Sequence, residues 1–336
     1  MDEKGEIQFY HEEDGDLEIL AEKTIGVIGY GNLGRPLALN MRDSGMRSII
    51  VGNIRNESWQ RAQEDGFPIF SIAEACSQVD IALLLLPDEA MTEVYETEIA
   101  PNLRKGSAMV FASGYNLAYN LIKPEKNLDV LLLAPRMLGR AIREKFLQGQ
   151  GFASFVSVEQ DASGQAWPLL LALAKATGSL KVGVMVLSAT QEAHLDLLIE
   201  QGLGPLIGAG VLASFKVGVE AGFPPEALVL EMYMSGEMAQ TFQTMATMGF
   251  FRQVNLHGFA AAFGGMIRSM ALDREPIEQS VRQALEEIKD GSFAKQLQAE
   301  KEEGYPSLSL LREMLRDENP VTAAEERLRR DMRFAY

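Results

Sequence analysis

The first part of the chain alternates between short apolar runs and segments with helical spacing. The apolar runs that read as strands lie at 24–30, 48–51, 81–86, 108–112, 129–134, 152–158 and 181–187. Segments suited to helices lie between them, the main ones at 35–45, 58–65, 89–100 and 164–177. Such alternation is typical of a parallel sheet covered by helices on both faces. The pattern predicts an α/β domain over residues 1–187.

The pattern changes after about residue 188, where the strand-like runs stop. Helical spacing takes over in the segments 190–203, 205–221, 224–248, 257–272 and 276–289. A chain of 336 residues is also too long for one ordinary hydrophobic core. The sequence therefore predicts a second, all-α domain over residues 188–336.

A glycine-rich turn joins the first predicted strand to the first predicted helix. It reads Gly29-Tyr30-Gly31-Asn32-Leu33-Gly34. In a dinucleotide-binding turn the first glycine allows the tight bend, the second admits the pyrophosphate, and the third lets helix and strand pack closely. The free N–H groups at the helix start then face the phosphates. An ordinary βα turn is the alternative, but strand, spacing and helix together favour a Rossmann domain that binds NAD or NADP.

The end of the second strand bears on the choice between the two cofactors. NAD-dependent domains place an acidic residue there to hold the ribose hydroxyls. This chain has Asn53, followed by Arg55 and Ser58, which can hold a 2′-phosphate. The segment favours NADP, although Glu57 between them and the alternative of a solvated loop for Arg55 keep NAD open.

Composition narrows the class of protein further. The formal net charge of −16 disfavours nucleic acids and anionic membranes as partners. No uninterrupted apolar run reaches the roughly 18 residues of a membrane span, and the acidic first residues argue against a secretory signal. Cys76 is the only cysteine, so no disulfide forms within the chain and a reducing cytoplasm is expected.

Carboxylates among apolar residues mark a candidate metal site in the predicted helical domain. Asp196 and Glu200 are four residues apart and share a helix face, as do Tyr233 and Glu237. Like charges at that spacing repel, and a divalent cation held by oxygen ligands would relieve the repulsion. A solvent-facing acidic stripe explains Asp196 and Glu200 equally well.

The sequence resembles the short form of the ketol-acid reductoisomerase family over nearly its whole length. The matched segments include Gly29-Tyr30-Gly31, Arg42-Asp43-Ser44-Gly45, Leu86-Pro87-Asp88-Glu89, Ala134-Pro135, Gln160-Asp161-Ala162-Ser163-Gly164, Asp196-Leu197, Glu200-Gln201 and Asp290-Gly291-Ser292-Phe293-Ala294-Lys295. So many segments in the same order are far more specific than the glycine turn alone.

The resemblance implies a Rossmann domain followed by a knotted, all-helical domain, and a homodimer or larger homo-oligomer. It also implies NADPH and two Mg²⁺ ions as cofactors. The family's reaction isomerises a 2-hydroxy-2-alkyl-3-keto acid by alkyl migration and then reduces the resulting 2-keto acid to a dihydroxy acid. The metals polarise the keto and hydroxyl oxygens. Pro87 and Asp88, in a matched segment, join the turn, Arg55 and Ser58 as expected cofactor-binding residues.

The match to the family is incomplete where the chemistry lies. Asp196 and Glu200 match the family's first pair of metal-binding acids. In the second pair, either Glu237 is kept with Tyr233 in place of the other acid, or, with the register moved by two, Glu231 is kept with Ser235. The family's Ala-His-Gly reads Ala112-Ser113-Gly114 here, and its Ala-Pro-Lys reads Ala134-Pro135-Arg136. A Ser-rich substrate segment has become 254–258, which contains His257.

Three hypotheses follow. The first is a reductoisomerase-like NAD(P)H oxidoreductase that reduces a small keto or imino acid without efficient isomerisation; Arg136 grips the substrate carboxylate, and Ser113, Tyr233 and His257 are candidates for proton transfer. The second is a true Mg²⁺-dependent ketol-acid reductoisomerase of branched-chain amino acid synthesis. The third is a non-catalytic protein that keeps the dinucleotide site. The predicted catalytic set is Ser113, Arg136, Tyr233 and Glu237; the predicted metal ligands are Asp196, Glu200 and Glu237.

Overall fold

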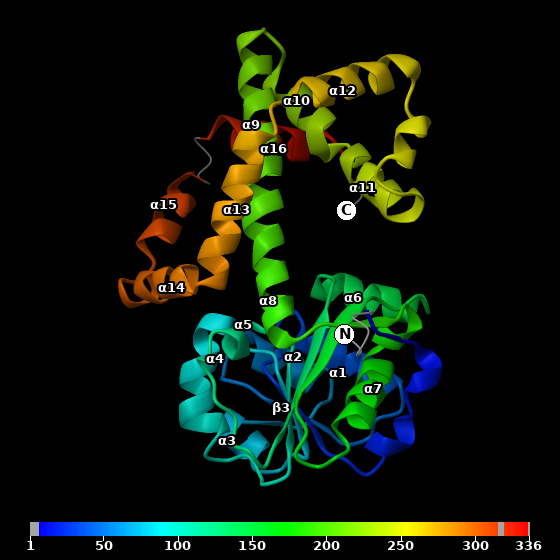
Figure 1. Ribbon diagram of the computed structural model, residues 1–336, viewed down its shortest axis with the longest axis vertical. Helices are drawn as coiled ribbons and strands as arrows, with labels where there is room; N and C mark the ends of the chain where they lie inside the picture. The colour runs from blue at the N-terminus through cyan, green and yellow to red at the C-terminus, as the bar shows by residue number, and fades with distance from the viewer. Residues whose placement is uncertain (1–6, 315–318, 335–336) are drawn as a thin grey trace. The chain divides into compact units, whose positions relative to one another are not determined.

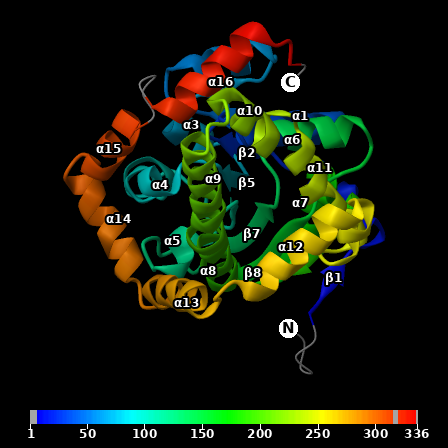
Figure 2. The same cartoon turned by 90° about the horizontal axis from the view of Figure 1, so that it is seen from above.

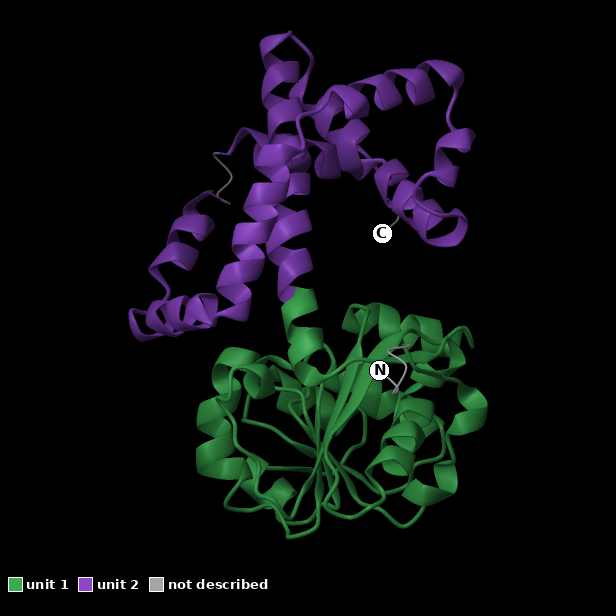
Figure 3. Cartoon of the chain, viewed as in Figure 1, with its two compact units in different colours: residues 1–196 green, residues 197–336 purple. Residues whose placement is uncertain are grey.

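The computed structural model describes residues 7–314 and 319–334. The first six residues, on which part of the expectation about a secretory signal depends, lie outside this range. The chain divides into two compact units, residues 1–196 and 197–336, which Figure 3 shows in separate colours. The boundary expected near residue 187 stays a prediction, since a compact unit need not coincide with a domain defined by sequence.

The first unit is built on one mixed sheet with helices on both faces (Figure 1). Its strands are β1 (Phe9–Tyr10), β2 (Ile25–Ile28), β3 (Ile49–Gly52), β4 (Ile69–Phe70), β5 (Ile81–Leu84), β6 (Ala108–Phe111), β7 (Asp129–Pro135), β8 (Ser154–Gln160) and β9 (Val184–Val186). Its helices are α1 (Gly34–Asp43), α2 (Glu57–Glu64), α3 (Ile72–Cys76), α4 (Asp88–Val94), α5 (Tyr115–Ala118), α6 (Gly139–Leu147), α7 (Ala166–Thr177) and α8 (Ala189–Leu198), with short segments η1 (Glu12–Asp14), η2 (Leu17–Leu20), η3 (Tyr95–Ile99) and η4 (Ser179–Lys181).

Alternation along the strands gives the sheet an apolar surface on each side. Ile25 and Val27 of β2 join a core with α1, α2 and α7, whereas Ile28 joins a second core with α3 and α4. Every residue of β2, β3, β5 and β6 is buried. These runs are continuously apolar because both faces of the sheet are covered.

The strand order is β1-β9-β8-β7-β6-β5-β2-β3-β4. Strands β2 to β7 run parallel, as the sequence predicts, but β8 is antiparallel to β7, and β1 is antiparallel to β9. Pro135, the last residue of β7, pairs with Ser154, the first of β8. The β7–β8 connection, which contains α6, therefore begins and ends on the same side of the sheet, at the carboxyl end of β7. As a result, β8 runs in the opposite direction to β7. The expectation of a parallel sheet was therefore wrong at the β7–β8 and β1–β9 pairs.

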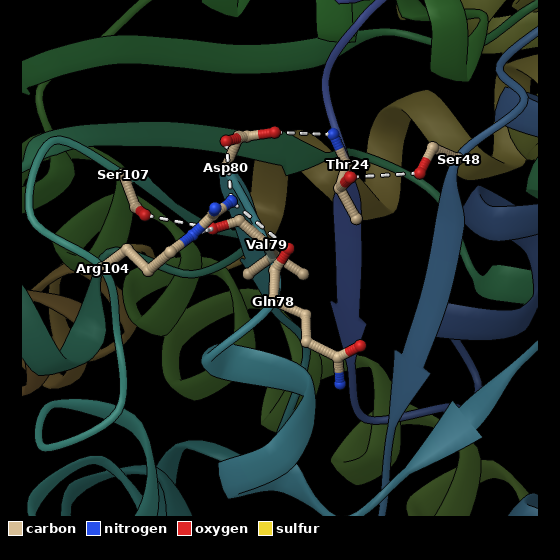
Figure 4. A network of polar contacts seen from close by, with 7 residues as sticks. All are labelled: Thr24, Ser48, Gln78, Val79, Asp80, Arg104 and Ser107. Atoms are coloured by element: carbon tan, nitrogen blue, oxygen red, sulfur yellow. Dashed lines mark hydrogen bonds and ion pairs between the residues drawn. The ribbon is translucent and has the colours of Figure 1, made fainter.

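A polar network ties together the amino ends of four strands (Figure 4). The Asp80 carboxylate accepts from the Thr24 backbone N–H at 2.8 Å and from the Arg104 guanidinium at 2.8 Å. Thr24 Oγ1 lies 3.1 Å from Ser48 Oγ, and Ser107 Oγ donates to the Val79 carbonyl at 3.1 Å. These groups directly precede β2, β3, β5 and β6, so the network stabilises the amino ends of these strands. The glycine turn lies at the carboxyl ends.

The second unit is helical throughout its described residues, as predicted. It contains η5 (Ile199–Leu203), α9 (Gly204–Glu220), α10 (Pro225–Val229), η6 (Leu230–Met234), α11 (Glu237–Met248), η7 (Arg252–Leu256), α12 (Phe259–Ala271), α13 (Glu275–Lys289), α14 (Ser292–Glu302), α15 (Pro306–Met314) and α16 (Pro320–Asp331). Its core joins α9, α10, η6 and α16 through Phe215, Val229, Met234, Ala324 and Leu328. In Figures 1 and 2, α12 and α14 extend away from α9 on different sides.

One long apolar helix bears on the expectation about membranes. Residues 189–220 form a helix of 32 residues that is long and apolar enough to cross a membrane by length and composition, with 17% of its most apolar window buried. The search for uninterrupted apolar residues missed it because glycines and Lys216 interrupt the run. A core helix of a protein that never meets a membrane passes the same test, so the expectation about membranes is neither confirmed nor overturned.

Candidate functional site

The glycine turn lies where the strand order reverses, at the carboxyl ends of β2 and β5. The chain leaves β2 toward β3 on one side and returns to β5 on the other, which is the position where open α/β sheets bind ligands. Gly29 has φ +98°, and its N–H donates to the Gly52 carbonyl at 2.8 Å. A Cβ on Gly34 would lie 1.9 Å from the Gly29 carbonyl oxygen, whereas a Cβ on Gly31 would meet nothing within 4 Å. The three glycines thus provide the bend, the open approach and the close packing that the motif requires.

Side chains from neighbouring elements hold this turn in place. Tyr30 is almost fully buried, and its hydroxyl donates to Asp65 at 2.9 Å. Asp65 also accepts two bonds from Arg35, at 2.6 and 3.0 Å. Burial, and then the bond to Asp65, raise the pKa of Tyr30 above its usual value. Tyr30 therefore anchors the turn and stays neutral, and its side chain faces the protein interior.

The loop after β3 is ordered by two asparagines. Asn53 Oδ1 accepts from the Tyr30 N–H at 3.2 Å, and Asn53 Nδ2 donates to Asn56 Oδ1 at 2.9 Å. Asn56 caps α2 by accepting from the N–H groups of Ser58 and Trp59. The Arg55 guanidinium lies 5.2 Å from the centre of the Trp59 ring. Arg55, on this loop, and Ser58, in the first turn of α2, are therefore held next to the glycine turn.

Asp88, at the start of α4 after β5, contacts the loop after β6. Its carboxylate accepts from Ser113 Oγ at 2.8 Å and from Asn116 Nδ2 at 2.9 Å. Burial raises the pKa of Asp88 to about 6, although the bonds from Ser113 and Asn116 act against the rise. Two residues predicted for different roles, cofactor binding for Asp88 and proton transfer for Ser113, are thus in direct contact.

Arg136 follows β7 and holds two carboxylates of α8. One terminal nitrogen lies 2.7 Å from Asp196 Oδ1, and the other lies 2.7 Å from Glu192 Oε1. Its guanidinium also lies 5.1 Å from the centre of the Phe155 ring, while Nε is buried and has no hydrogen-bond partner within the described residues. The grip expected of Arg136 on a substrate carboxylate is at present directed at two carboxylates of the protein itself.

Glu192 is the residue that the sequence analysis missed. It is 1% exposed, and its second oxygen accepts from the Gly114 N–H at 2.7 Å. Burial raises the pKa of Glu192, while the Gly114 N–H and Arg136 lower it. The signal was available, because Glu192, Asp196 and Glu200 recur at intervals of four and therefore fall on one face of a regular helix.

The predicted residues of the second unit lie in different surroundings. Tyr233, in η6, donates its hydroxyl to Glu325 of α16 at 2.6 Å, and burial together with this bond raises its pKa. Glu237 is exposed at the start of α11. His257 Nε2 lies 3.1 Å from Gln253 Oε1, and Glu200 lies in η5. Across residues 7–314 and 319–334, no group of three His, Cys, Asp or Glu side chains is placed to hold a metal ion.

A Rossmann unit with a glycine turn at its switch point, followed by a helical unit, defines a class of dinucleotide-dependent two-domain oxidoreductases. Two family models cover the chain: the NADPH-binding domain of acetohydroxy acid isomeroreductase matches residues 19–183, and the C-terminal domain of ketol-acid reductoisomerase matches residues 190–334. The chain belongs to the ketol-acid reductoisomerase family and is an NAD(P)H-dependent oxidoreductase.

Individual relatives agree with the family models. A Saccharolobus solfataricus protein provisionally named ketol-acid reductoisomerase 3 is 40% identical over 93% of this chain and 95% of its own length. A ketol-acid reductoisomerase (NADP⁺) of Pyrobaculum neutrophilum is 36% identical over 96% and 98%. The solved structure of an NADH-preferring ketol-acid reductoisomerase from an uncultured archaeon has a TM-score of 0.92 and 31% identity, and covers 97% of this chain and 100% of its own.

Proposed function

We propose that this protein is a ketol-acid reductoisomerase of branched-chain amino acid synthesis. It would isomerise a 2-hydroxy-2-alkyl-3-keto acid and reduce the product with NADPH. The main observation behind this proposal is that the models of both family domains match this chain, in the same order and over nearly its whole length. This supports the second hypothesis from the sequence better than the first, which assumed that isomerisation was lost.

The structure supports a role for each part of the first unit. The turn from Gly29 to Gly34 would bind the pyrophosphate, because Gly31 leaves its surroundings open. Arg55 and Ser58 would hold a 2′-phosphate, which favours NADPH over NADH. Pro87 and Asp88 follow β5 at the switch point and would contact the nicotinamide half. Arg136 would orient the substrate carboxylate, with Ser113 beside it on the loop after β6.

The family implies Mg²⁺, and the carboxylates of this chain have the donor chemistry that this ion prefers, although the described residues do not bring three of them together. Asp196, Glu200 and Glu237 would supply carboxylate oxygens, which Mg²⁺ prefers. A bound ion would polarise the keto and hydroxyl oxygens of the substrate. Arg136 would keep Asp196 oriented through their 2.7 Å contact, while Glu192, buried on the other side of the guanidinium, would fix Arg136 itself.

The test is turnover of 2-acetolactate with NADPH, followed by mass detection of the dihydroxy acid. Activity should disappear with EDTA and return with Mg²⁺. A parallel assay with the already isomerised 2-keto acid measures reduction alone. Reduction of that compound without turnover of 2-acetolactate would refute the proposal and leave an oxidoreductase of keto or imino acids, whereas NADPH binding without any turnover would leave a non-catalytic protein.

A reductase without isomerisation is the second candidate, and one contact favours it. The ion pair between Arg136 and Asp196 engages a predicted metal ligand with a permanent cation. Arg136→Lys should weaken this competition, because lysine cannot bridge two carboxylates in a planar fork. Calorimetric titration with Mg²⁺ would then give several-fold tighter binding. Arg140→Lys, at an exposed position of α6, is the control. Unchanged Mg²⁺ affinity would remove this support.

We also propose a homodimer or larger homo-oligomer. In the second unit, large apolar side chains such as Phe251 (83% exposed) and Phe259 (85%) lie on the surface. Exposed apolar patches of this kind mark interaction surfaces. Size-exclusion chromatography with light scattering should give at least twice the 37.0 kDa chain mass; a monomer at micromolar concentration would refute the proposal.

The buried single thiol, Cys76, still favours a reducing cytoplasm as the compartment.

A further inference from the structure

Asp88 is held at three points by two neighbouring elements. Ser113 Oγ donates to Oδ2 at 2.8 Å, Asn116 Nδ2 donates to Oδ1 at 2.9 Å, and the same amide also approaches the Asp88 carbonyl at 3.3 Å. Thr92 Oγ1 donates to Asn116 Oδ1 at 3.0 Å and fixes the amide orientation. Each oxygen of the carboxyl group therefore has its own neutral donor, and Oδ2 is directed at the Ser113 hydroxyl.

The charges around Asp88 do not favour its ionised form. Glu89 on its own helix and Asp196 on α8 raise its pKa, as burial does more strongly. Glu192 on α8 and Tyr115 on α5 also interact with it electrostatically. The nearby cation, Arg136, is engaged by Glu192 and Asp196. With a pKa of about 6, Asp88 exchanges its proton close to neutral pH.

Serine at position 113 needs such a neighbour if it is to transfer protons. The related family has histidine at this position, and an imidazole can hold a proton by itself near neutral pH. A serine hydroxyl cannot, but it can accept one proton and donate another at the same time. A titratable group on its far side would therefore restore what the imidazole provides.

We propose that Asp88 is the proton store of the active site and that Ser113 relays its proton to the substrate oxygen. This rests on the proposed function, which places the substrate at Ser113. As hydride moves from the nicotinamide to the carbonyl carbon, the carbonyl oxygen takes the Ser113 hydroxyl proton and becomes an alcohol. Ser113 Oγ takes the carboxyl proton of Asp88, and Asp88, now a carboxylate, is reprotonated from water. Asp88 is thus a positioning and proton-supplying residue that acts through Ser113.

The test compares the pH dependence of a single turnover in four proteins. NADPH oxidation by the isomerised 2-keto acid is followed from pH 5 to 9 in the wild type, Asp88→Asn, Ser113→Ala and Asp80→Asn. The amide of Asp88→Asn keeps an acceptor and a donor for its neighbours but holds no transferable proton. Asp80 precedes β5, whereas Asp88 follows it, and Asp80 controls for the loss of a hydrogen-bonded carboxylate; Figure 4 shows its hydrogen bonds.

The wild-type rate should fall as pH rises above about 6, as should that of Asp80→Asn. Asp88→Asn and Ser113→Ala should be about 100- to 10,000-fold slower at pH 6, the usual contribution of general acid catalysis, and should lose this pH dependence. In Asp88→Asn, the further change Ser113→His should restore a pH-dependent rate, because imidazole carries its own proton. A wild-type pH profile in Asp88→Asn overturns the relay.

A second measurement separates failure of the relay from failure of the proposed function. Carbon-13 NMR of labelled aspartate carboxyls, assigned with Asp88→Asn, follows the Asp88 titration in the full chain without substrate. The pKa should rise further in Ser113→Ala, because the bond from Ser113 stabilises the carboxylate. The relay is overturned if Asp88 has the pKa of an ordinary aspartate and if this pKa is the same in the wild type and in Ser113→Ala. This holds even if 2-acetolactate is converted. Absence of turnover with every 2-keto acid, beside a raised and Ser113-sensitive pKa, would instead refute the proposed function and with it the catalytic use of the pair.

Discussion

The two units of the chain differ in how completely they bury their apolar residues. The sheet unit packs both faces of its sheet and buries even polar residues such as Asn40 and Asn116. The helical unit buries a small cluster around Phe215 and Met234 and exposes many large apolar side chains along α9, α11 and α12. A sheet covered on both faces completes its own core, whereas the helices of the second unit leave apolar faces uncovered. Four experiments test this difference.

The largest effect is expected at Gly34. A Cβ there would lie 1.9 Å from the Gly29 carbonyl oxygen, so Gly34→Ala should destabilise the sheet unit by about 3 kcal/mol and abolish NADPH binding. Gly31→Ala is the matched control: its Cβ meets open space, so stability should be kept while the pyrophosphate is excluded. Thermal melts and NADPH fluorescence titrations measure both. A melting temperature of Gly34→Ala equal to that of the wild type would contradict the tight packing.

The next effect concerns the exposed faces of the helical unit. Phe251→Glu combined with Phe259→Glu should dissociate the proposed oligomer, because burial of a Phe side chain favours association and burial of an unpaired Glu opposes it. Leu147→Glu, at a position 65% exposed in the sheet unit, should leave the oligomer intact. Light scattering across a dilution series measures the difference. An oligomer that resists the double substitution would show that these two side chains lie outside the contact.

A smaller effect is expected from Asp88→Asn, and it depends on pH. The folded state raises the pKa of Asp88 from 3.8 to about 6, so between these values the folded chain binds more protons than the unfolded chain. The wild type therefore loses stability as pH rises from about 4 to about 6. Asp88→Asn should lack this loss and melt a few degrees higher than the wild type at pH 8, with little difference at pH 4. A constant difference across the range would contradict the raised pKa.

The smallest effect is expected at Arg104, in the network at the amino edge of the sheet. Arg104→Ala removes the 2.8 Å contact with Asp80, but the Arg104 side chain is half exposed, so the loss should be about 1 kcal/mol in urea unfolding. NADPH affinity should not change, because the glycine turn lies at the opposite edge. A change in affinity would mean that the two edges are coupled.

Most strands of the sheet, the change to a helical second part and the glycine turn were predictable from the sequence, whereas the short β1 and the division of 224–248 into α10, η6 and α11 were not predicted. Each of the predictable features is encoded locally, by alternation within a strand or by residues adjacent in the chain. The antiparallel β8 was not predictable, since its direction depends on where the β7–β8 connection returns the chain. The contact between Asp88 and Ser113 joins residues that are 25 positions apart. The contacts of Arg136 with Glu192 and Asp196 join residues that are 56 and 60 positions apart. Contacts of that kind depend on which strands are neighbours.

The roles of Tyr233 and Glu237 stay predictions. The structure gives a physical reason why their segment can be aligned with the family's second acid pair in two ways. Their segment is where the two possible registers of the acid pair differ by two positions. The structure places Tyr233 in η6, a π-helical segment, and Glu237 after Gly236, whose φ is +84°. Neither the π turn nor the left-handed glycine follows the regular spacing on which a four-residue motif relies.

Three π-helical segments, η3, η5 and η6, occur in the described chain, and two of them hold Glu200 and Tyr233. A π turn closes from residue i to i+5 and so accommodates one residue more than an α turn. Gain or loss of a single codon there can be absorbed by widening or tightening one turn, while the helix on either side keeps its own packing. Such a segment allows the direction of one side chain to change while the rest of the helix keeps its packing. Homologous positions across η5 and η6 should therefore be matched by superposing structures turn by turn. Counting residues from a shared sequence motif can pair the wrong positions.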